Sequence, residues 1–376
     1  MDETAPLFPP LDSIEQILWP GVALAAFVAS AILVDVMILL ATRWHILDLP
    51  SRRSAHSLPT ARAGGVPMVL VGSLACLAIC YRWPETTVPV ILGVLLPSVA
   101  IALVGFVDDI RPLRATLRLG VQIGVALVMV AVLGPIGSVR LPGLGDIDFG
   151  QAAWPLSIVW VVGMINAWNF MDGSDGMAAT GAVVVAVFFA SAGFLVSSPV
   201  LLLGASFVGA SAAGFLVFNW PPARVFMGDV GSAWLGAMLA GLALVPGAER
   251  GPEVFGALLM AMWPYVFDPL LTVVRRVVTG NNPLVPHREF LFHRLVRAGW
   301  SHLSVASLYA ALAAVGGLAG RLMLDEAVPV EVRRWLPAVV PLLAAALVAL
   351  VEERFRLSKT AAPRAELGGL RRPEGR

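Results

Sequence analysis

Long apolar stretches alternate with short polar connections along most of the chain. Each stretch is close to the roughly 20 residues that a helix needs to cross the hydrocarbon core of a bilayer. The stretches lie at about residues 17–42, 66–81, 88–107, 119–134, 154–170, 177–195, 199–218, 232–247, 254–274, 303–320 and 335–351. The pattern predicts an all-α integral membrane protein, a bundle of about eleven transmembrane helices.

Composition supports this class and simplifies the domain organisation. Of the 376 residues, 58% are hydrophobic and only 14% are charged, which excludes an ordinary soluble domain. A net charge of +1 gives no sign of nucleic acid as a partner. We expect a single polytopic membrane domain over residues 1–351 and a basic tail over 352–376.

The distribution of positive charge predicts the orientation of the bundle. Alternate connections and the C-terminal tail hold 20 of the 26 Lys and Arg residues, and the other connections hold 6. Because short cytoplasmic loops are enriched in positive charge, the first set is predicted to be cytoplasmic, with the N-terminus outside and the C-terminus inside. The first residues are acidic and lack the basic region of a cleavable signal peptide, so we expect the first helix to be retained.

Polar residues gather beside the spans on the predicted cytoplasmic side only. Charges at the centre of a bilayer cost roughly 2.5 to 3.5 kcal/mol each, so such clusters need a reason. The clusters occupy residues 51–65, 105–119, 166–178, 219–232 and 286–302. This asymmetry is typical of an enzyme that uses a cytoplasmic substrate.

The first candidate pair is Asp108 and Asp109, directly after an apolar stretch. Two adjacent carboxylates repel each other, and a divalent cation or a bound proton would relieve that repulsion. The alternative is a solvated helix end with salt bridges to Arg111, Arg114 or Arg118.

Residues spaced by three form the second candidate, namely Asn166, Asn169, Asp172 and Asp175. On a helix that continues the fifth span, they would lie near one face. The D-G-x-D-G sequence that contains both aspartates suits a turn with two hard oxygen ligands for Mg²⁺. The alternative is a simple turn built on Asp and Gly propensity.

The third candidate is Asp229 in the sequence FMGDVGS. Gly228 and Gly231 would allow close approach of the backbone, and Ser232 would cap the helix that begins the next span. A helix N-terminus beside a carboxylate is a suitable seat for phosphate and a metal ion. Alternatively, Asp229 merely caps that helix.

Two basic segments are candidate anion sites. One carries Arg52, Arg53, His56 and Arg62, and we expect it to bind diphosphate or to serve as a topology anchor. The other carries His287, Arg288 and His293, with Arg294 and Arg297 close by, in an arrangement typical of an anion-binding loop. A loop that only orients the helices would have the same composition.

In this order, the segments resemble the polyprenyl-phosphate N-acetylhexosamine-1-phosphate transferase family, which includes the peptidoglycan lipid I synthase. The resemblance covers about residues 45–302. It rests on VDD after a span, N-x-x-N-x-x-D-G-x-D-G, F-M-G-D-x-G-S, and the runs at 48–56 and 59–65. It implies a bundle of ten or eleven helices with a cytoplasmic active site in the bacterial inner membrane.

The resemblance also implies an activity and roles for the candidate residues. The reaction transfers an N-acetylhexosamine 1-phosphate from a UDP-sugar to undecaprenyl or another polyprenyl phosphate, releasing UMP. Asp108 and Asp109 match the pair implicated in catalysis, Asn169 and Asp172 match positions that handle nucleotide and metal, and Asp229 matches a magnesium ligand. Mg²⁺ is the implied cofactor, with Mn²⁺ as an alternative, and a homodimer is left open.

The chain departs from many members of the family in the His287 loop. A second histidine often follows the first by two or three residues, but Glu289 and Phe290 stand there. Lipid I synthases commonly have a third aspartate after the pair, where this chain has Ile110. The resemblance is therefore closer to the branch that initiates O-antigen or other cell-envelope polysaccharides with a sugar such as GlcNAc, QuiNAc or FucNAc.

Two other functional classes are compatible with a helical bundle that carries charged residues. An ion-coupled transporter would place polar groups near the midplane, where only Asp35 is clearly inside a span, since Asp268 lies towards the cytoplasmic end of its own. An intramembrane aspartyl protease would need a G-x-G-D sequence before Asp229, but Phe226 occupies its first position.

Overall fold

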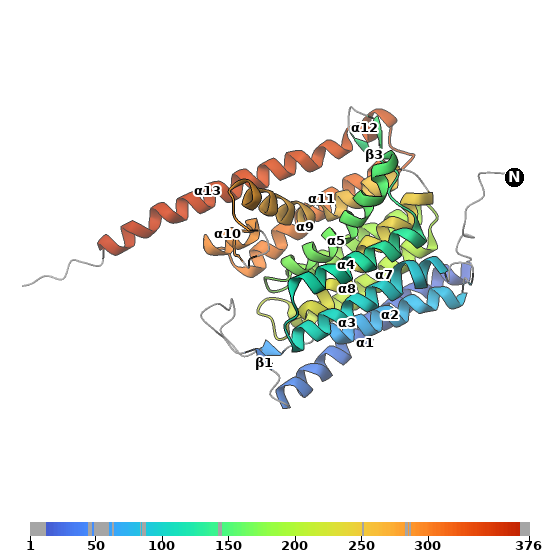
Figure 1. The fold of residues 1–376 in the computed structure, drawn as a ribbon, viewed down its shortest axis with the longest axis horizontal. Helices are drawn as coiled ribbons and strands as arrows, with labels where there is room; N and C mark the ends of the chain where they lie inside the picture. The colour runs from blue at the N-terminus through green and yellow to red at the C-terminus, as the bar shows by residue number, and fades with distance from the viewer. Residues whose placement is uncertain are drawn as a thin grey trace, which may run out of the picture.

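The protein is described by a computed structural model over residues 13–43, 47–48, 60–61, 64–82, 84, 88–141, 145–249, 252–282, 285 and 287–368. It is built almost wholly of helices that run side by side in one bundle (Figure 1). The long helices are α1 (Ser13–Arg43), α2 (Gly65–Arg82), η2 (Val88–Leu95) with α3 (Leu96–Ile110), α4 (Ala115–Leu133), α5 (Ala153–Met171), α6 (Met177–Leu195), α7 (Pro199–Asn219), α8 (Gly228–Glu249), α9 (Pro252–Val278), α11 (His302–Leu324) and α13 (Val339–Gly368).

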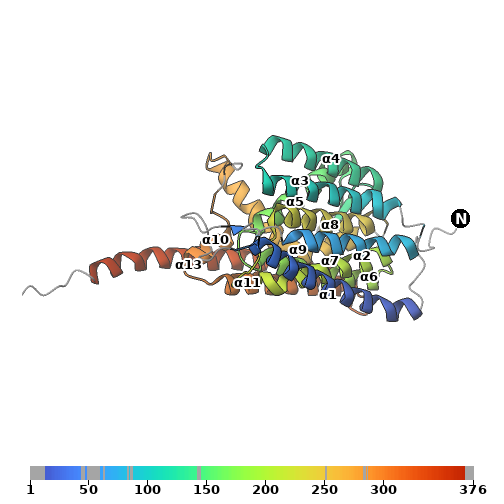
Figure 2. The same ribbon diagram turned by 90° about the horizontal axis from the view of Figure 1, so that it is seen from below.

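Short elements mark the two ends of the bundle. They are the antiparallel pairs β1 (Leu47–Asp48) with β2 (Thr60–Ala61) and β3 (Ser138–Leu141) with β4 (Gly145–Asp148), and the short helices η3 (Gly150–Ala152), α10 (Leu291–Arg297), α12 (Val330–Trp335) and η4 (Leu336–Ala338). Figure 1 shows β1 and α10 at one end and β3 and α12 at the opposite end. Figure 2 gives the same arrangement from below, with α13 projecting past α10.

The observed helices coincide with every apolar stretch in the sequence, which confirms the predicted fold class. Nine of the described helices are long and apolar enough to cross a membrane, and Gly65–Tyr81 is a shorter apolar helix. The third stretch begins as a π-helix before α3, and Pro97 in the first turn of α3 lacks the N–H that a continuous α-helical ladder would use. The predicted boundary at residue 351 lies inside α13.

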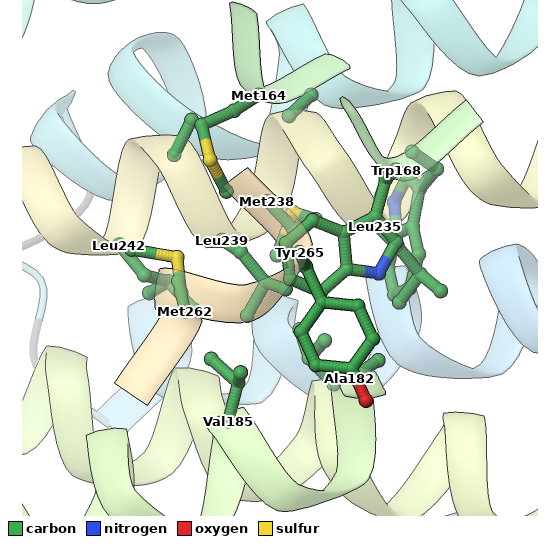
Figure 3. Packing of buried hydrophobic residues seen from close by; sticks show 14 of the residues in the cluster. Met164, Trp168, Ala182, Val185, Leu235, Met238, Leu239, Leu242, Met262 and Tyr265 are labelled. Atoms are coloured by element: carbon green, nitrogen blue, oxygen red, sulfur yellow. The ribbon is translucent and has the colours of Figure 1, made fainter. Parts of the chain in front are cut away.

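Helix α8 forms the centre of the bundle, packed against α2, α3, α5, α7 and α9. The segment Gly228–Val245 is 89% buried, whereas the apolar windows of the first and last spans are only 17% buried. Figure 3 shows the packing beside α8, where Trp168 of α5 and Tyr265 of α9 lie with ring centroids 5.4 Å apart. The start of α8 is therefore held by helices on several sides.

The periphery of the bundle is apolar rather than polar. Leu24 and Leu39 of α1 and Leu342 of α13 are all more than half exposed. Apolar side chains of this size on the outside, with helices satisfying their own backbone hydrogen bonds, are what a lipid solvent requires.

Candidate active site

Four helix ends meet at one point of the bundle and bring three of the predicted residues together. Arg118, in the first turns of α4, donates hydrogen bonds to Asp108 Oδ2 at 2.7 Å and to Asp229 Oδ2 at 3.2 Å. Asn169, near the end of α5, donates to Asp229 Oδ1 at 2.8 Å. Asp108 and Asp229 are thus two carboxylates bridged by one guanidinium group.

Asp108 also holds the turn between α3 and α4. Its Oδ1 accepts the backbone N–H of Leu113 at 2.5 Å, and its side chain is only 10% exposed. The salt bridge from Asp108 to an arginine behind it, the plainer of the two interpretations, is therefore present and involves Arg118. The sequence did not lead us to predict Arg118 as a site residue. The available signal was an arginine near the start of the helix that follows the carboxylate pair.

Asp109 has a different position and caps the N-terminus of α8 from the neighbouring helix. Its two carboxylate oxygens accept the backbone N–H groups of Asp229 at 3.0 Å and Val230 at 3.2 Å. A carboxylate at a helix N-terminus satisfies orphan N–H groups and opposes the positive end of the helix dipole. Asp109 therefore fixes the backbone of Asp229.

This arrangement corrects the prediction that Ser232 caps the helix after the FMGD sequence. Helix α8 begins at Gly228, so Ser232 lies inside it, and its Oγ donates to the carbonyl of Gly228 at 3.1 Å. Asp229 is not the cap either, because Asp109 receives the free N–H groups. The cap comes from a residue 120 positions earlier, which no local pattern reveals.

The glycines beside Asp229 serve packing. Gly228 has φ +72°, and a Cβ there would lie 2.6 Å from Asp109 Oδ2. Gly231 packs against α2, since a Cβ at Gly231 would lie 3.0 Å from the Cα of Gly65. Gly231 thus lets two helices approach each other, and its predicted role of admitting a ligand is replaced by this contact.

Replacement of Gly228 with alanine is expected to destabilise the protein by about 1–3 kcal/mol, because a side chain is strained at positive φ and displaces the Asp109 carboxylate. The midpoint of heat-induced aggregation of purified protein should fall. Gly120→Ala is the matched control, because a Cβ at Gly120 meets nothing within 4 Å. Equal midpoints for the two variants would contradict the proposed contact.

Asp172 lies directly after α5, close to the other carboxylates. The residue is half-buried, and burial raises the pKa of its carboxyl group well above the usual range. The negative charges of Asp229, Asp109 and Asp175 raise this pKa further. The described carboxylates therefore concentrate negative charge at one place, and a bound proton or cation would relieve it.

Asp175 is turned towards a neighbouring segment. Its Oδ2 accepts the N–H of Ala223 at 3.1 Å. Asn219 supports the same turn, because its Oδ1 accepts the N–H of Gly176 at 3.0 Å and its Nδ2 donates to Val225 O at 2.8 Å. The D-G-x-D-G turn is thus held against residues 219–225, and Asp175 contributes charge and a structural contact.

Asn166 lies one turn deeper in α5 than Asn169 and has separate partners. Its Nδ2 donates to Gln122 Oε1 at 2.7 Å and to Val162 O at 2.8 Å. The spacing of three predicted that both asparagines lie near one face of the helix, but Asn166 joins α5 to α4, and none of its described hydrogen bonds is with the carboxylates.

The histidines of the second basic segment lie on and before α10. A Cβ built on Gly173 would be 3.2 Å from His293 Nε2, so His293 lies against the turn that follows Asp172. Burial, and then the charge of Arg288, lowers the pKa of His293 to about 4. Burial and Arg276 also lower the pKa of His287. A lowered pKa favours the neutral imidazole of His293 at pH 7, which offers hydrogen bonds rather than charge, and the predicted binding roles of His287 and His293 stay predictions.

The loss of stability at acid pH should report whether His293 is neutral in the folded protein. The unfolded imidazole takes up a proton near pH 6.5 and the folded one only near pH 4, so stability falls as pH is lowered between these values. At pH 5 the loss is about 2 kcal/mol. Aggregation midpoints at pH 7.5 and pH 5 should therefore differ less for His293→Gln than for the unaltered protein. An unchanged difference would mean that His293 is not held neutral.

Asp268 of α9 was missed as a positioning residue. It is fully buried, and its oxygens accept the N–H groups of Leu291 at 2.7 Å and Phe292 at 3.1 Å and the hydroxyl of Tyr309 at 2.7 Å. It therefore fixes the start of α10, which carries His293. The available signal was an aspartate inside an apolar stretch, which calls for buried partners.

The donor set fits a hard divalent cation. Asp108, Asp172 and Asp229 supply carboxylate oxygens, the ligand type that Mg²⁺ prefers, and Arg118 offsets the repulsion between Asp108 and Asp229. As they stand, no three acidic, histidine or cysteine side chains of the described residues are arranged to hold one metal ion. Arg118 and Asn169 hold the carboxylates in this arrangement.

Four predicted residues, Arg52, Arg53, His56 and Arg62, lie outside the described residues. Arg288 is described and its side chain is exposed. The predicted roles of all five in binding stay predictions.

A helical bundle of membrane-spanning length with carboxylates and an arginine gathered at one end is compatible with a membrane-embedded enzyme. Residues 91–247 match the profile of Glycosyl transferase family 4. The chain is 31% identical over 268 residues to the probable undecaprenyl-phosphate N-acetylglucosaminyl 1-phosphate transferase of Bacillus subtilis (strain 168). The aligned region covers 70% of this chain and 73% of that relative. The chain belongs to this family of transferases.

Two further relatives extend the comparison. Phospho-N-acetylmuramoyl-pentapeptide-transferase of Synechococcus sp. (strain JA-3-3Ab) is 32% identical over 309 residues, 76% of this chain and 86% of the relative. Decaprenyl-phosphate N-acetylglucosaminephosphotransferase of Mycolicibacterium smegmatis is 30% identical over 292 residues, 70% of this chain and 71% of the relative. These relatives confirm the family resemblance seen in the motifs and are incompatible with the transporter alternative.

Proposed function

We propose that the protein transfers an N-acetylhexosamine 1-phosphate from a UDP-sugar to undecaprenyl phosphate or another polyprenyl phosphate, with release of UMP. The observation that carries the proposal is the pairing of Asp108 and Asp229 with Arg118 at one end of a membrane bundle, with Asp172 close to Asp229. The names of the relatives support the carrier lipid and the amino sugar.

In the proposed reaction, an oxygen of the polyprenyl phosphate forms a bond to the sugar-linked phosphorus of the UDP-sugar. The bond from that phosphorus to the bridging oxygen breaks, and UMP leaves with the oxygen. Both reactants are anions, so the site must offset their repulsion and stabilise the charge of the transition state. Arg118 is the described cation placed between the carboxylates for this purpose.

We propose different roles for the two aspartates of the pair. Both carboxylate oxygens of Asp109 accept hydrogen bonds at the N-terminus of α8, so Asp109 positions Asp229. Asp108, at the end of α3 and paired with Arg118, faces the carrier phosphate and keeps it ionised, or attacks phosphorus in a two-step route. Asn169 orients the Asp229 carboxylate.

Asp229 and Asp172 would hold Mg²⁺, with Asp175 adding negative charge nearby. When bound, the ion supplies a Lewis acid for phosphoryl oxygens. The high pKa of Asp172 supports this role, because a cation that neutralises the cluster would favour the ionised carboxylate. We place this end of the bundle at the cytoplasmic face of the bacterial inner membrane, as the positive-charge pattern predicts.

The test uses purified protein in lipid nanodiscs with undecaprenyl phosphate, Mg²⁺ and UDP-GlcNAc, with UMP release as the readout. We expect UMP only when the carrier is present. UDP-N-acetylmuramoyl-pentapeptide, the other sugar class suggested by the relatives, serves as the competing substrate. Absence of UMP with every UDP-amino sugar would contradict the proposal.

Isotope exchange distinguishes the two routes at Asp108. Direct attack requires both substrates to be bound, so labelled UMP should not enter UDP-GlcNAc in discs without carrier. A covalent aspartyl intermediate would exchange the label without carrier. We expect no exchange, because both Asp108 oxygens already accept hydrogen bonds from Leu113 and Arg118.

A further inference from the structure

A second polar site lies beside α10 and shares no residue with the carboxylate cluster. A cavity of about 360 Å³ opens between the end of α9, α10 and α13. Four arginines line it, together with Glu289, Phe355, Thr272 of α9 and Thr279 just after it: Arg275, Arg276, Arg294 and Arg297. None of these arginines contributes to the cluster around Asp229.

The charges in this arginine pocket do not cancel. Arg276 pairs with Glu289 at 2.7 Å, and Glu352 of α13 is shared by Arg275 at 3.1 Å and Arg294 at 2.6 Å. Arg297 forms no ion pair with a described residue, and its guanidinium lies 5.3 Å from the ring centroid of Phe355. Four positive and two negative side chains leave a formal charge of +2.

Arg276 indicates that the pocket is built for an anion. The residue is only 7% exposed, and its terminal nitrogens donate to Glu289 at 2.7 Å and to the carbonyl of Asn282 at 2.8 Å. Its Nε is buried and has no hydrogen-bond partner among the described residues. A buried donor without a partner costs about 1–3 kcal/mol, which an incoming oxygen acceptor would recover.

The surroundings of the pocket favour a lipid over a soluble anion. The apolar window of α13 is only 17% buried, and it leads along that helix to Glu352 and Phe355 beside the pocket. Arg275 lies near the basic end of α9, and Glu352 lies where the apolar part of α13 gives way to charged residues. A phosphate in the pocket could thus remain attached to acyl chains that lie along α13.

We propose that the arginine pocket binds the phosphate headgroup of an anionic bilayer phospholipid, with its acyl chains along the exposed apolar part of α13. The bound lipid would lie beside α10, which also places His293 at the Gly173 turn. Because Arg294 and Glu352 already clamp α10 to α13, the lipid phosphate would strengthen the attachment of α10.

The test measures bound lipid and does not depend on the transferase activity. Protein in phosphatidylcholine nanodiscs with or without phosphatidylglycerol is released into detergent, and retained lipids are counted by native mass spectrometry. We expect one phosphatidylglycerol to be retained and to raise the aggregation midpoint. The double variant Arg275→Gln/Arg297→Gln should bind about thirtyfold more weakly, as expected for two basic side chains at a lipid surface.

A matched control separates a site from general surface charge. Arg354→Gln/Arg356→Gln removes the same charge from exposed positions of α13 that do not line the pocket, and it should retain the lipid. The single variant Arg297→Gln breaks no described ion pair and keeps the test valid if the double variant does not fold.

Four results would overturn the proposal. The first is equal retention of lipid by the unaltered protein and by Arg297→Gln. The second is an equal loss in the Arg354→Gln/Arg356→Gln control. The third is a midpoint in phosphatidylcholine discs that inorganic phosphate raises as much as phosphatidylglycerol does, which would make the pocket a site for soluble anions. Retention of undecaprenyl phosphate in preference to phosphatidylglycerol would likewise replace the proposed ligand with the carrier.

Discussion

Asp229→Asn is expected to lower the rate of UMP release by about a hundredfold or more while the protein stays folded. Asparagine can still accept the hydrogen bond from Asn169, and the cap of α8 is unaffected because it comes from Asp109. What disappears is the charge that faces Arg118 and would hold Mg²⁺. Activity should be measured over a range of Mg²⁺ concentrations, and the residual rate should need more of the ion.

Asp175→Asn is the control for this experiment. Asparagine can keep the hydrogen bond from Ala223, so the turn should survive with one negative charge fewer. We expect a modest change in rate and in Mg²⁺ requirement. A normal rate and normal Mg²⁺ dependence in Asp229→Asn would remove Asp229 from the mechanism and direct attention to Asp172.

Asp268→Asn is expected to lower activity about tenfold to a hundredfold from a position outside the carboxylate cluster. The change replaces one carboxylate oxygen by an amide that cannot accept the N–H of Leu291 or Phe292, so the start of α10 loses its support. A buried donor left without a partner costs about 1–3 kcal/mol. Hydrogen exchange over residues 287–297 should rise together with the loss of UMP release.

Tyr309→Phe provides the graded comparison for Asp268. It removes one hydroxyl donor at 2.7 Å and leaves both N–H groups on the carboxylate. Its effect on hydrogen exchange should therefore be much smaller than that of Asp268→Asn. If activity falls in Asp268→Asn without any change in exchange over residues 287–297, then Asp268 does not act through α10.

The helices could be predicted because the length and hydropathy of each stretch are local properties. The clustering of polar segments at one end was also predictable, since charge is costly inside a bilayer. Asn169, Asp108 and Asp229 met as expected because each stands at a helix end on that side.

The partners of these residues could not be predicted, since they depend on which helices pack together. Asp108 and Asp109 are adjacent in sequence, yet one pairs with Arg118 and the other caps α8, because successive side chains on a helix point about 100° apart. The lowered pKa of His293 follows from its burial beside Gly173. The basic composition of residues 286–302 gave no sign of this burial.

The N-termini of α8 and α10 are each capped by a carboxylate from another helix, Asp109 for α8 and Asp268 for α10. Neither helix start is therefore an independent module that can be exchanged between relatives. A chimaera that takes residues 228–249 from another family member must bring a compatible α3, and one that takes residues 291–297 must bring a compatible α9. Recombination that respects these two pairs should yield folded proteins more often than recombination at the connecting loops.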